Sequence, residues 1–216
     1  CRYCKEKISF QYPLVELATA LVFVLLAFFL SINLTELSFP QVLELLYLWA
    51  MAVLLIAIFV YDLKYFLVPD QILFPAIGIA VLWRIFEFLN FDILNVQSLL
   101  AGISAAVFFL AIFLISRGAA MGFGDVKLAL PLGVIVGLGG VFSMVVLSFW
   151  IGAVISVSLL LLERLMKRGK TSLHFLAVPL TIKSEVPFAP FLIMGFSLVH
   201  FWHANIFEIT ETLFFW

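Results

Sequence analysis

The apolar stretch at residues 43–61 reads LELLYLWAMAVLLIAIFVY, and Asp62 follows it directly. A helix that crosses the hydrocarbon core of a bilayer needs about 20 such residues. A carboxylate at the end of a membrane helix is costly in lipid and marks a candidate functional residue. The stretch therefore predicts a membrane helix that delivers one carboxylate to the membrane interface.

Similar stretches occupy most of the chain. Of its 216 residues, 65% are hydrophobic and 12% are charged, against roughly 45–50% and 25% in soluble domains. No alternating β-barrel pattern and no internal repeat is found in the sequence. The composition excludes a water-soluble domain and predicts an all-α, polytopic membrane helical bundle, with apolar stretches at residues 14–34, 43–61, 71–89, 97–116, 126–162 and 187–203.

The stretch at 126–162 is too long for one span. Gly137, Gly139 and Gly140 predict a turn that divides it into helices at about 128–141 and 143–163. The chain then holds about seven membrane segments. The fifth would reach only about 21 Å, less than the ~30 Å hydrocarbon core.

We expect three regions along the chain: a remnant of a cytosolic, cysteine-containing region at 1–13, the membrane bundle at 14–204 and an extracytoplasmic tail at 205–216. The chain begins at Cys1 and not at a methionine, so we expect a further segment in front of it.

Positive charge predicts the orientation, because Lys and Arg accumulate in cytoplasmic loops. With the N-terminus in the cytosol, only Arg84 lies towards the other side of the membrane. Asp62 and Asp125 then both emerge at the cytosolic surface. The cytosolic side would hold the other eleven basic residues: Arg2, Lys5, Lys7, Lys64, Arg117, Lys127, Arg164, Lys167, Arg168, Lys170 and Lys183.

The net charge of −1 gives no electrostatic basis for nucleic-acid binding.

The second acidic position lies in the sequence GFGDVK at residues 122–127. Gly122 and Gly124 have no Cβ atom, so a substrate or a facing helix could approach Asp125 closely. The sequence is not a phosphate loop, because it lacks the Gly-Lys-Ser/Thr ending. A third carboxylate, Asp70, follows Pro69 and is expected to cap the next helix.

Two carboxylates about 4 Å apart at an effective dielectric near 20 repel by about 4 kcal/mol, or roughly three pKa units. One of them then holds a proton while the other is ionised. This is the condition for aspartyl proteolysis, in which the ionised group takes a proton from water and the protonated group polarises the peptide carbonyl. Asp62 and Asp125 are the candidates for such a pair.

Several short motifs together resemble those of the bacterial prepilin peptidases, also called type IV leader peptidases. The resemblance extends from Cys1 to about Gly195. It is carried by Asp62 with Val68-Pro69-Asp70, by GFGDVK, by Cys1-Arg2-Tyr3-Cys4, by Tyr12-Pro13-Leu14-Val15-Glu16, and by Val186-Pro187-Phe188-Ala189-Pro190-Phe191.

The resemblance implies an enzyme of the bacterial cytoplasmic (inner) membrane with its active site facing the cytosol. Its partners would be the lipid bilayer and prepilins or pseudopilins, from which it would cleave a short basic leader. The implied catalytic residues are Asp62 and Asp125. The implied substrate-binding or active-site loop residues are Gly122, Gly124, Lys127, Pro69 and Asp70.

Bifunctional members of this family also methylate the new N-terminus with S-adenosylmethionine, and they carry two Cys-x-x-Cys pairs. Cys1 and Cys4 have the spacing of half a tetrahedral zinc site. A disulfide is the alternative, which a cytosolic location disfavours. The resemblance thus implies zinc and S-adenosylmethionine for the full-length protein, whereas proteolysis needs neither.

Two other functions are compatible with some of the same residues. A small ion-coupled transporter would also hold carboxylates in the membrane, although near the midplane and often in repeated halves. A preflagellin or presenilin-like protease would share the aspartates. The cysteine pair and the Tyr12–Glu16 motif favour a prepilin peptidase over the latter.

Overall fold

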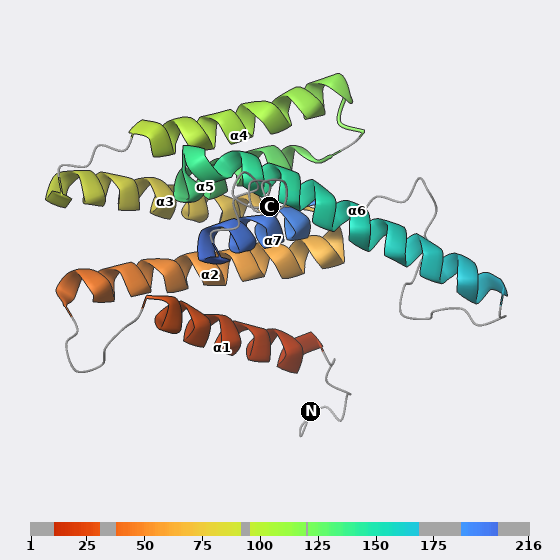
Figure 1. Cartoon of the computed structure of the whole chain (residues 1–216), viewed down its shortest axis with the longest axis horizontal. Helices are drawn as coiled ribbons and strands as arrows, with labels where there is room; N and C mark the ends of the chain where they lie inside the picture. The colour runs from red at the N-terminus through yellow and green to blue at the C-terminus, as the bar shows by residue number, and fades with distance from the viewer. Residues whose placement is uncertain (1–10, 31–37, 92–95, 120, 169–186, 203–216) are drawn as a thin grey trace, which may run out of the picture. The chain divides into compact units, whose positions relative to one another are not determined.

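The computed structural model describes residues 11–30, 38–91, 96–119, 121–168 and 187–202. All regular structure in these ranges is helical (Figure 1), which confirms the predicted all-α class. Five of the helices are long and apolar enough to cross a membrane; the other two, α5 and α7, have 14 residues each. The helices are α1 (Gln11–Phe29), α2 (Phe39–Tyr65), α3 (Asp70–Phe91), α4 (Val96–Ile115), α5 (Phe123–Val136), α6 (Leu138–Arg168) and α7 (Ala189–Trp202).

The predicted division of residues 126–162 is confirmed, although the helix bounds differ. Helix α5 ends at Val136 and α6 begins at Leu138. Gly137 between them has a φ of 77°, and its N–H donates to the Gly133 carbonyl at 2.9 Å. One glycine in this left-handed conformation suffices for the turn. Gly139 and Gly140, which were expected in the turn, lie inside α6.

The chain divides into two compact units, residues 1–57 and 58–216, with the division inside α2. In the first unit, the rings of Phe23 and Trp49 stack at 5.1 Å, and the Trp49 indole donates to the Phe23 carbonyl at 3.3 Å. Helix α1 already begins at Gln11, inside the expected remnant at 1–13. The expected tail at 205–216 lies outside the described residues.

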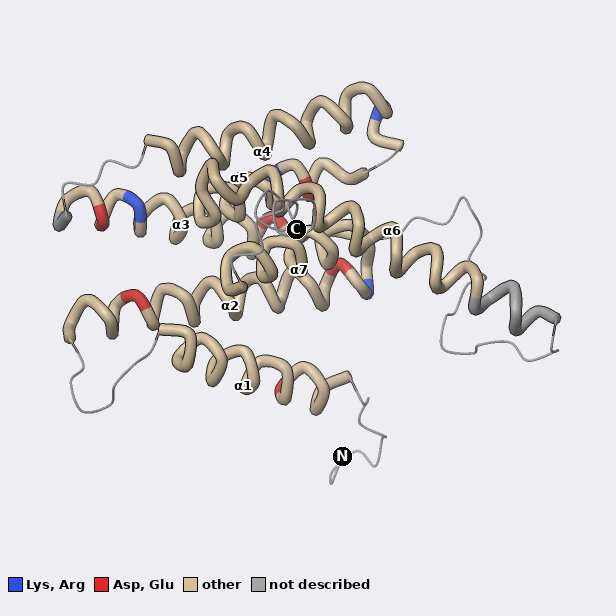
Figure 2. Tube along the Cα trace, in the orientation of Figure 1, with Lys and Arg blue, Asp and Glu red and all other residues tan. Residues whose placement is uncertain are grey.

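Helix α5 is the centre of the second unit. It lies between α3 and α4 (Figure 1) and also contacts α6 and α7. Leu128, Ala129 and Leu132 on α5 are fully buried. Charged residues are sparse along the described helices around it (Figure 2). A helix in this position is held by packing on several sides.

The backbones of α4 and α5 are in direct contact. A Cβ atom at Gly133 would lie 2.8 Å from the Ala101 carbonyl oxygen and 2.9 Å from the Gly102 Cα atom. A Cβ atom at Gly102 would lie 2.7 Å from the Leu130 carbonyl oxygen. Small residues allow such close approach between membrane helices, where dispersion contacts replace the hydrophobic effect as the source of association.

We expect Gly133→Ala to lower the free energy of unfolding by about 1–3 kcal/mol, because the atoms that the new methyl group meets are backbone and cannot rotate away. Gly78→Ala on α3 is the matched control. A Cβ atom there meets nothing within 4 Å, so this change should be neutral or stabilise the helix by up to about 1 kcal/mol. Thermal unfolding of both purified variants in detergent measures the difference. Equal stabilities would show that α4 and α5 do not pack as closely as described.

Candidate active site

Asp62 lies near the end of α2 and belongs to the second unit. Its side chain is buried, with 4% exposed. The backbone N–H of Ala189, the first residue of α7, hydrogen-bonds to the carboxylate. The Oδ2 atom is buried and has no hydrogen-bond partner among the described residues. Asp62 thus presents one oxygen held by a helix N-terminus and one that is free to accept a proton.

The contact with Ala189 explains part of the motif at residues 186–191. Pro190 follows Ala189 and supplies a fixed φ, which favours the first turn of a helix. The N–H groups at a helix N-terminus have no intrahelical acceptor and attract anions. The contact between this motif and Asp62 was not predicted. Pro190 could have indicated it, because a proline in the first turn marks the N-terminus of a helix, where free N–H groups can bind a carboxylate.

Asp125 lies in the first turn of α5 and is also buried, with 6% exposed. Gly122 precedes the helix in an extended conformation, with φ −75° and ψ 152°. The Asp125 N–H donates to the Gly122 carbonyl at 3.2 Å, and the backbone of Gly122 hydrogen-bonds in return to the Asp125 carboxylate. The bond from the Gly122 backbone to the Asp125 carboxylate corresponds to one half of a capping box, without the side-chain cap that glycine cannot supply, and it fixes the carboxylate at the start of the helix.

The two carboxylates interact. Burial raises the pKa of Asp125 to about 7, with the charge of Asp62 as the second cause and the Gly122 hydrogen bond acting in the opposite direction. Asp125 lies outside the five candidate spans. The structure thus brings together the two aspartates that the sequence analysis paired, and their catalytic role stays a prediction.

The two glycines before Asp125 have different surroundings. A Cβ atom at Gly124 would lie 2.7 Å from Val68 Cβ, so this glycine lets the α2–α3 connection pack against the start of α5. A Cβ atom at Gly122 would have only Asp125 Oδ2 and the Gly124 nitrogen within 4 Å, at 3.8 and 3.9 Å. Gly124 therefore serves packing, whereas Gly122 is exposed and meets no close contact among the described residues.

Asp70 does not cap α3 as expected. The N–H groups of Ile72 and Leu73 donate to the Pro69 carbonyl, so Pro69 precedes the helix and Asp70 is its first residue. The Asp70 carboxylate accepts from Lys127 Nζ at 2.7 and 2.9 Å. The predicted cap was wrong because a cation from a distant motif binds the side chain.

The Asp70–Lys127 ion pair connects the start of α3 to the start of α5. Lys127 Nζ also lies 5.2 Å from the centre of the Phe123 ring. The Asp70 side chain is 53% exposed, so the pair contributes at most about 1 kcal/mol to stability. Lys127 is two residues after Asp125, so the ion pair holds the start of α5 to the start of α3 close to this aspartate.

The metal prediction cannot be followed into the structure, because Cys1 and Cys4 lie outside the described residues. Within the described ranges, no group of three or more His, Cys, Asp or Glu side chains could hold a metal ion.

The fold and this site define a class: a multi-pass helical membrane protein with two buried, interacting carboxylates at helix ends. Comparison with known proteins then identifies the family. The chain belongs to the type IV leader peptidase family, whose model matches residues 49–157. The model of the bacterial peptidase A24 N-terminal domain matches residues 1–30. These matches confirm the resemblance, and no solved structure matches the chain.

Curated relatives agree with the family match. The prepilin leader peptidase/N-methyltransferase of Aeromonas hydrophila is 28% identical over 207 residues, which cover 95% of this chain and 63% of that protein. The Bacillus subtilis protein of the same name is 29% identical over 206 residues, 95% of this chain and 72% of that protein. The type 4 prepilin-like proteins leader peptide-processing enzyme of Escherichia coli is 32% identical over 189 residues, 81% of this chain and 60% of that protein. The chain thus spans about 63% of the length of the Aeromonas relative.

We expect Gly124→Ala to slow the prepilin cleavage that is proposed below at least about tenfold, because the new methyl group collides with Val68 and displaces Asp125, and small misplacements of reacting groups are costly. The second change Val68→Gly removes the colliding atoms and should restore most of the rate. Cleavage kinetics of the single and double variants, with folding checked by circular dichroism, measure this effect. Full activity of Gly124→Ala would show that the contact with Val68 does not position Asp125.

Proposed function

We propose that the protein is an aspartyl endopeptidase that cleaves the basic leader from type IV prepilins or pseudopilins at the cytosolic side of the bacterial inner membrane. The family match supports leader cleavage. The single observation that supports the aspartyl mechanism is the buried, interacting pair of Asp62 and Asp125.

In the proposed reaction, Asp62 is the ionised member of the pair and Asp125 the protonated one. With a pKa of about 7, Asp125 is protonated in about half of the molecules at neutral pH, a far larger share than for an ordinary aspartate. The hydrogen bond from the Ala189 N–H favours the charged form of Asp62, whereas burial of the side chain opposes it; we assign the charge to Asp62 on the strength of this hydrogen bond. This assignment gives each carboxyl group the protonation state that its role requires.

Hydrolysis then proceeds by general acid–base catalysis. Asp62 takes a proton from water while the water oxygen bonds to the carbonyl carbon of the scissile peptide. Asp125 donates its proton to the carbonyl oxygen. The tetrahedral intermediate collapses when the carbon–nitrogen bond breaks, the nitrogen takes the proton held by Asp62 and the hydroxyl proton returns to Asp125. Both carboxyl groups end as they began.

The surroundings of the pair are suited to a peptide substrate. Gly122 is exposed and has no side chain beside Asp125 Oδ2, which supports the approach of an extended backbone from this side. Lys64 follows Asp62 closely and Lys127 follows Asp125. Under the positive-inside rule these lysines support a cytosolic position for the pair, where the leader of a membrane-inserted prepilin would lie.

We also propose one further activity and one metal site for the complete protein. The names of the Aeromonas and Bacillus relatives include N-methyltransferase, which supports methylation of the new N-terminus with S-adenosylmethionine. The Cys-x-x-Cys spacing of Cys1 and Cys4 supports a zinc site in the same region. Peptide hydrolysis as proposed does not depend on either group.

The test of the proposed function is the removal of each carboxylate. Asp62→Asn, Asp125→Asn and the double variant should each lower the cleavage rate by at least about 10³-fold, and the double variant should be no worse than the singles, because groups that act as one unit are non-additive. Glu16→Gln on the exposed face of α1 is the matched control and should retain wild-type activity.

Tagged prepilins incubated with the purified, folded variants give the rates. Near-normal turnover of either single asparagine variant would contradict the pair. Failure of the wild-type protein to remove the leader from any prepilin or pseudopilin of its own genome would contradict the proposed activity.

A further inference from the structure

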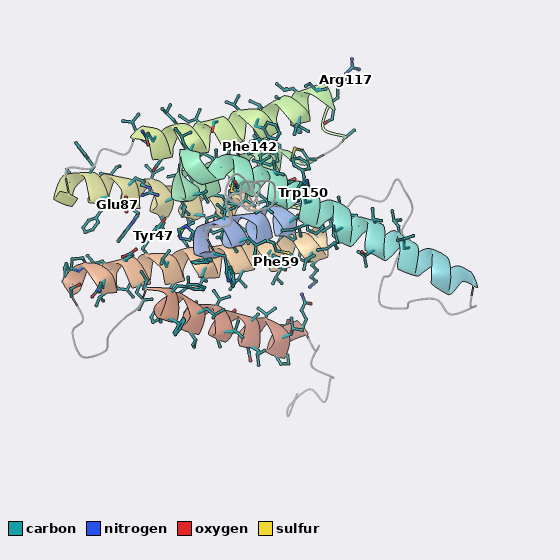
Figure 3. The ribbon with its side chains drawn as sticks, in the orientation of Figure 1. Tyr47, Phe59, Glu87, Arg117, Phe142 and Trp150 are labelled. Atoms are coloured by element: carbon teal, nitrogen blue, oxygen red, sulfur yellow. The ribbon has the colours of Figure 1, made fainter. Side chains whose placement is uncertain are left out.

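The end of α5 away from Asp125 is held by a charged side chain from another helix. Arg84 on α3 donates from Nη2 to the carbonyl oxygens of Val134 and Ile135, at 3.0 Å each. Its Nη1 donates to Glu87 Oε2 at 2.7 Å. Trp83 Nε1 donates to the other Glu87 oxygen at 2.8 Å. Figure 3 labels Glu87 on α3.

Placing the charged side chains of Arg84 and Glu87 within a membrane span costs free energy, so their presence there calls for an explanation. Arg84 and Glu87 lie within the candidate span Asp70–Leu89, and charged groups at such positions are rare and usually functional. Both are partly buried, with 20% and 29% of their side chains exposed. Arg84 is also the one basic residue that the predicted topology places away from the cytosolic side.

The need for Arg84 follows from the length of α5. A helix of 14 residues is about 21 Å long and cannot reach from one side of the bilayer to the other. Its last carbonyl groups have no intrahelical donor, and in an apolar environment each must find one. The Gly137 N–H satisfies Gly133, and Arg84 satisfies the next two carbonyls. A cation there also complements the negative end of the helix dipole.

We propose that Arg84 is a positioning residue for peptide cleavage: by holding the C-terminal end of α5 to α3, it fixes the place of Asp125 beside Asp62. This inference rests on the proposed function. Asp125 and Val134 lie on the same helix, about 14 Å apart along its axis. Pro131 between them has no backbone N–H, but it is fully buried, so packing holds the helix there and a displacement at one end is carried to the other.

The Asp70–Lys127 contact holds the opposite end of the same two helices. That contact is more exposed and is near the active site, whereas the Arg84 contact is remote from it. With both contacts on α3, this helix sets the axial position of α5. Close packing on α4 at Gly102 and Gly133 restricts its lateral position. Loss of Arg84 is therefore expected to let α5 shift along its own axis, while its packing against α4 is retained.

The test compares Glu87→Gln with the double variant Arg84→Met/Glu87→Gln. The glutamine side chain in both variants keeps an oxygen that can accept from Trp83, and neither variant leaves the Glu87 carboxylate unpaired, so the comparison reports the loss of Arg84 together with its contacts to Val134 and Ile135. We expect kcat for prepilin cleavage to fall at least about tenfold in the double variant relative to Glu87→Gln, with KM changed by less than about twofold. Ser197→Ala, which removes a hydrogen bond within α7, controls for the loss of any polar group in the bundle.

A second readout reports position without activity. In a background of Cys1→Ser and Cys4→Ser, the pair Asp62→Cys/Asp125→Cys should form a disulfide on oxidation, and Arg84→Met/Glu87→Gln should slow its formation at least about threefold, because a disulfide tolerates little change in Cβ separation. If the double variant does not fold, Arg84→Lys is the deciding variant. It keeps the charge but loses the fork that serves two carbonyls, and it should show a smaller fall in kcat.

Unchanged kcat with lower thermal stability would overturn the proposal, because Arg84 would then serve the fold alone. Unchanged disulfide formation would also overturn it. A wild-type protein that cleaves no prepilin would instead contradict the proposed function, and the positioning of Asp125 by Arg84 would then be judged by the disulfide rates of the Asp62→Cys/Asp125→Cys protein with and without Arg84→Met/Glu87→Gln.

Discussion

The burial of Asp62 and Asp125 in one site is the constraint on which the arrangement of the second unit depends. Two carboxylates that share a buried site oppose the packing that brings them together, so the surrounding helices must hold them there. Each receives one backbone hydrogen bond, from Ala189 at the start of α7 or from Gly122 at the start of α5. These donors favour the charged form of each group, and the raised pKa of Asp125 shows that they do not fully offset burial and repulsion.

The second constraint is the length of α5. A short helix can place its N-terminal aspartate inside the bundle, but both of its ends must then be satisfied by the protein. The N-terminal end uses Gly122 and the contact of Gly124 with Val68, and the C-terminal end uses Gly137 and Arg84. The same feature that buries Asp125 thus creates the requirement for a cation on α3.

Much of this architecture was predictable from the sequence. Hydropathy predicted the helices, because lipid imposes length and composition on every spanning segment. Gly137, Gly139 and Gly140 predicted a turn that divides α5 from α6, and of these Gly137 makes it, with a positive φ that favours glycine. The positive-inside rule paired Asp62 with Asp125 across 63 residues of sequence, because it places both on one side of the membrane.

Apart from the bounds of α1 and α6, the errors and omissions involve contacts between distant residues. Asp70 has the local pattern of a helix cap, but Lys127 binds it instead. Arg84 was assigned only to a side of the membrane, and nothing near it in the sequence indicates that it binds carbonyls of α5. Ala189 has no polar side chain to attract attention, since its backbone makes the contact. Such interactions depend on which residues the tertiary structure brings together, and unlike helices they produce no repeating hydropathy pattern in the sequence.

The coupling between the two aspartates can be measured directly by carboxyl-carbon NMR of Asp125 in the purified, detergent-solubilised protein. The account predicts that Asp125 titrates with a pKa of about 7 and that Asp62→Asn lowers this pKa, because the neighbouring negative charge is gone while burial remains. An Asp125 that titrates in the ordinary range near 4, or whose pKa is the same in Asp62→Asn, would contradict the claim that the two carboxylates act as one unit.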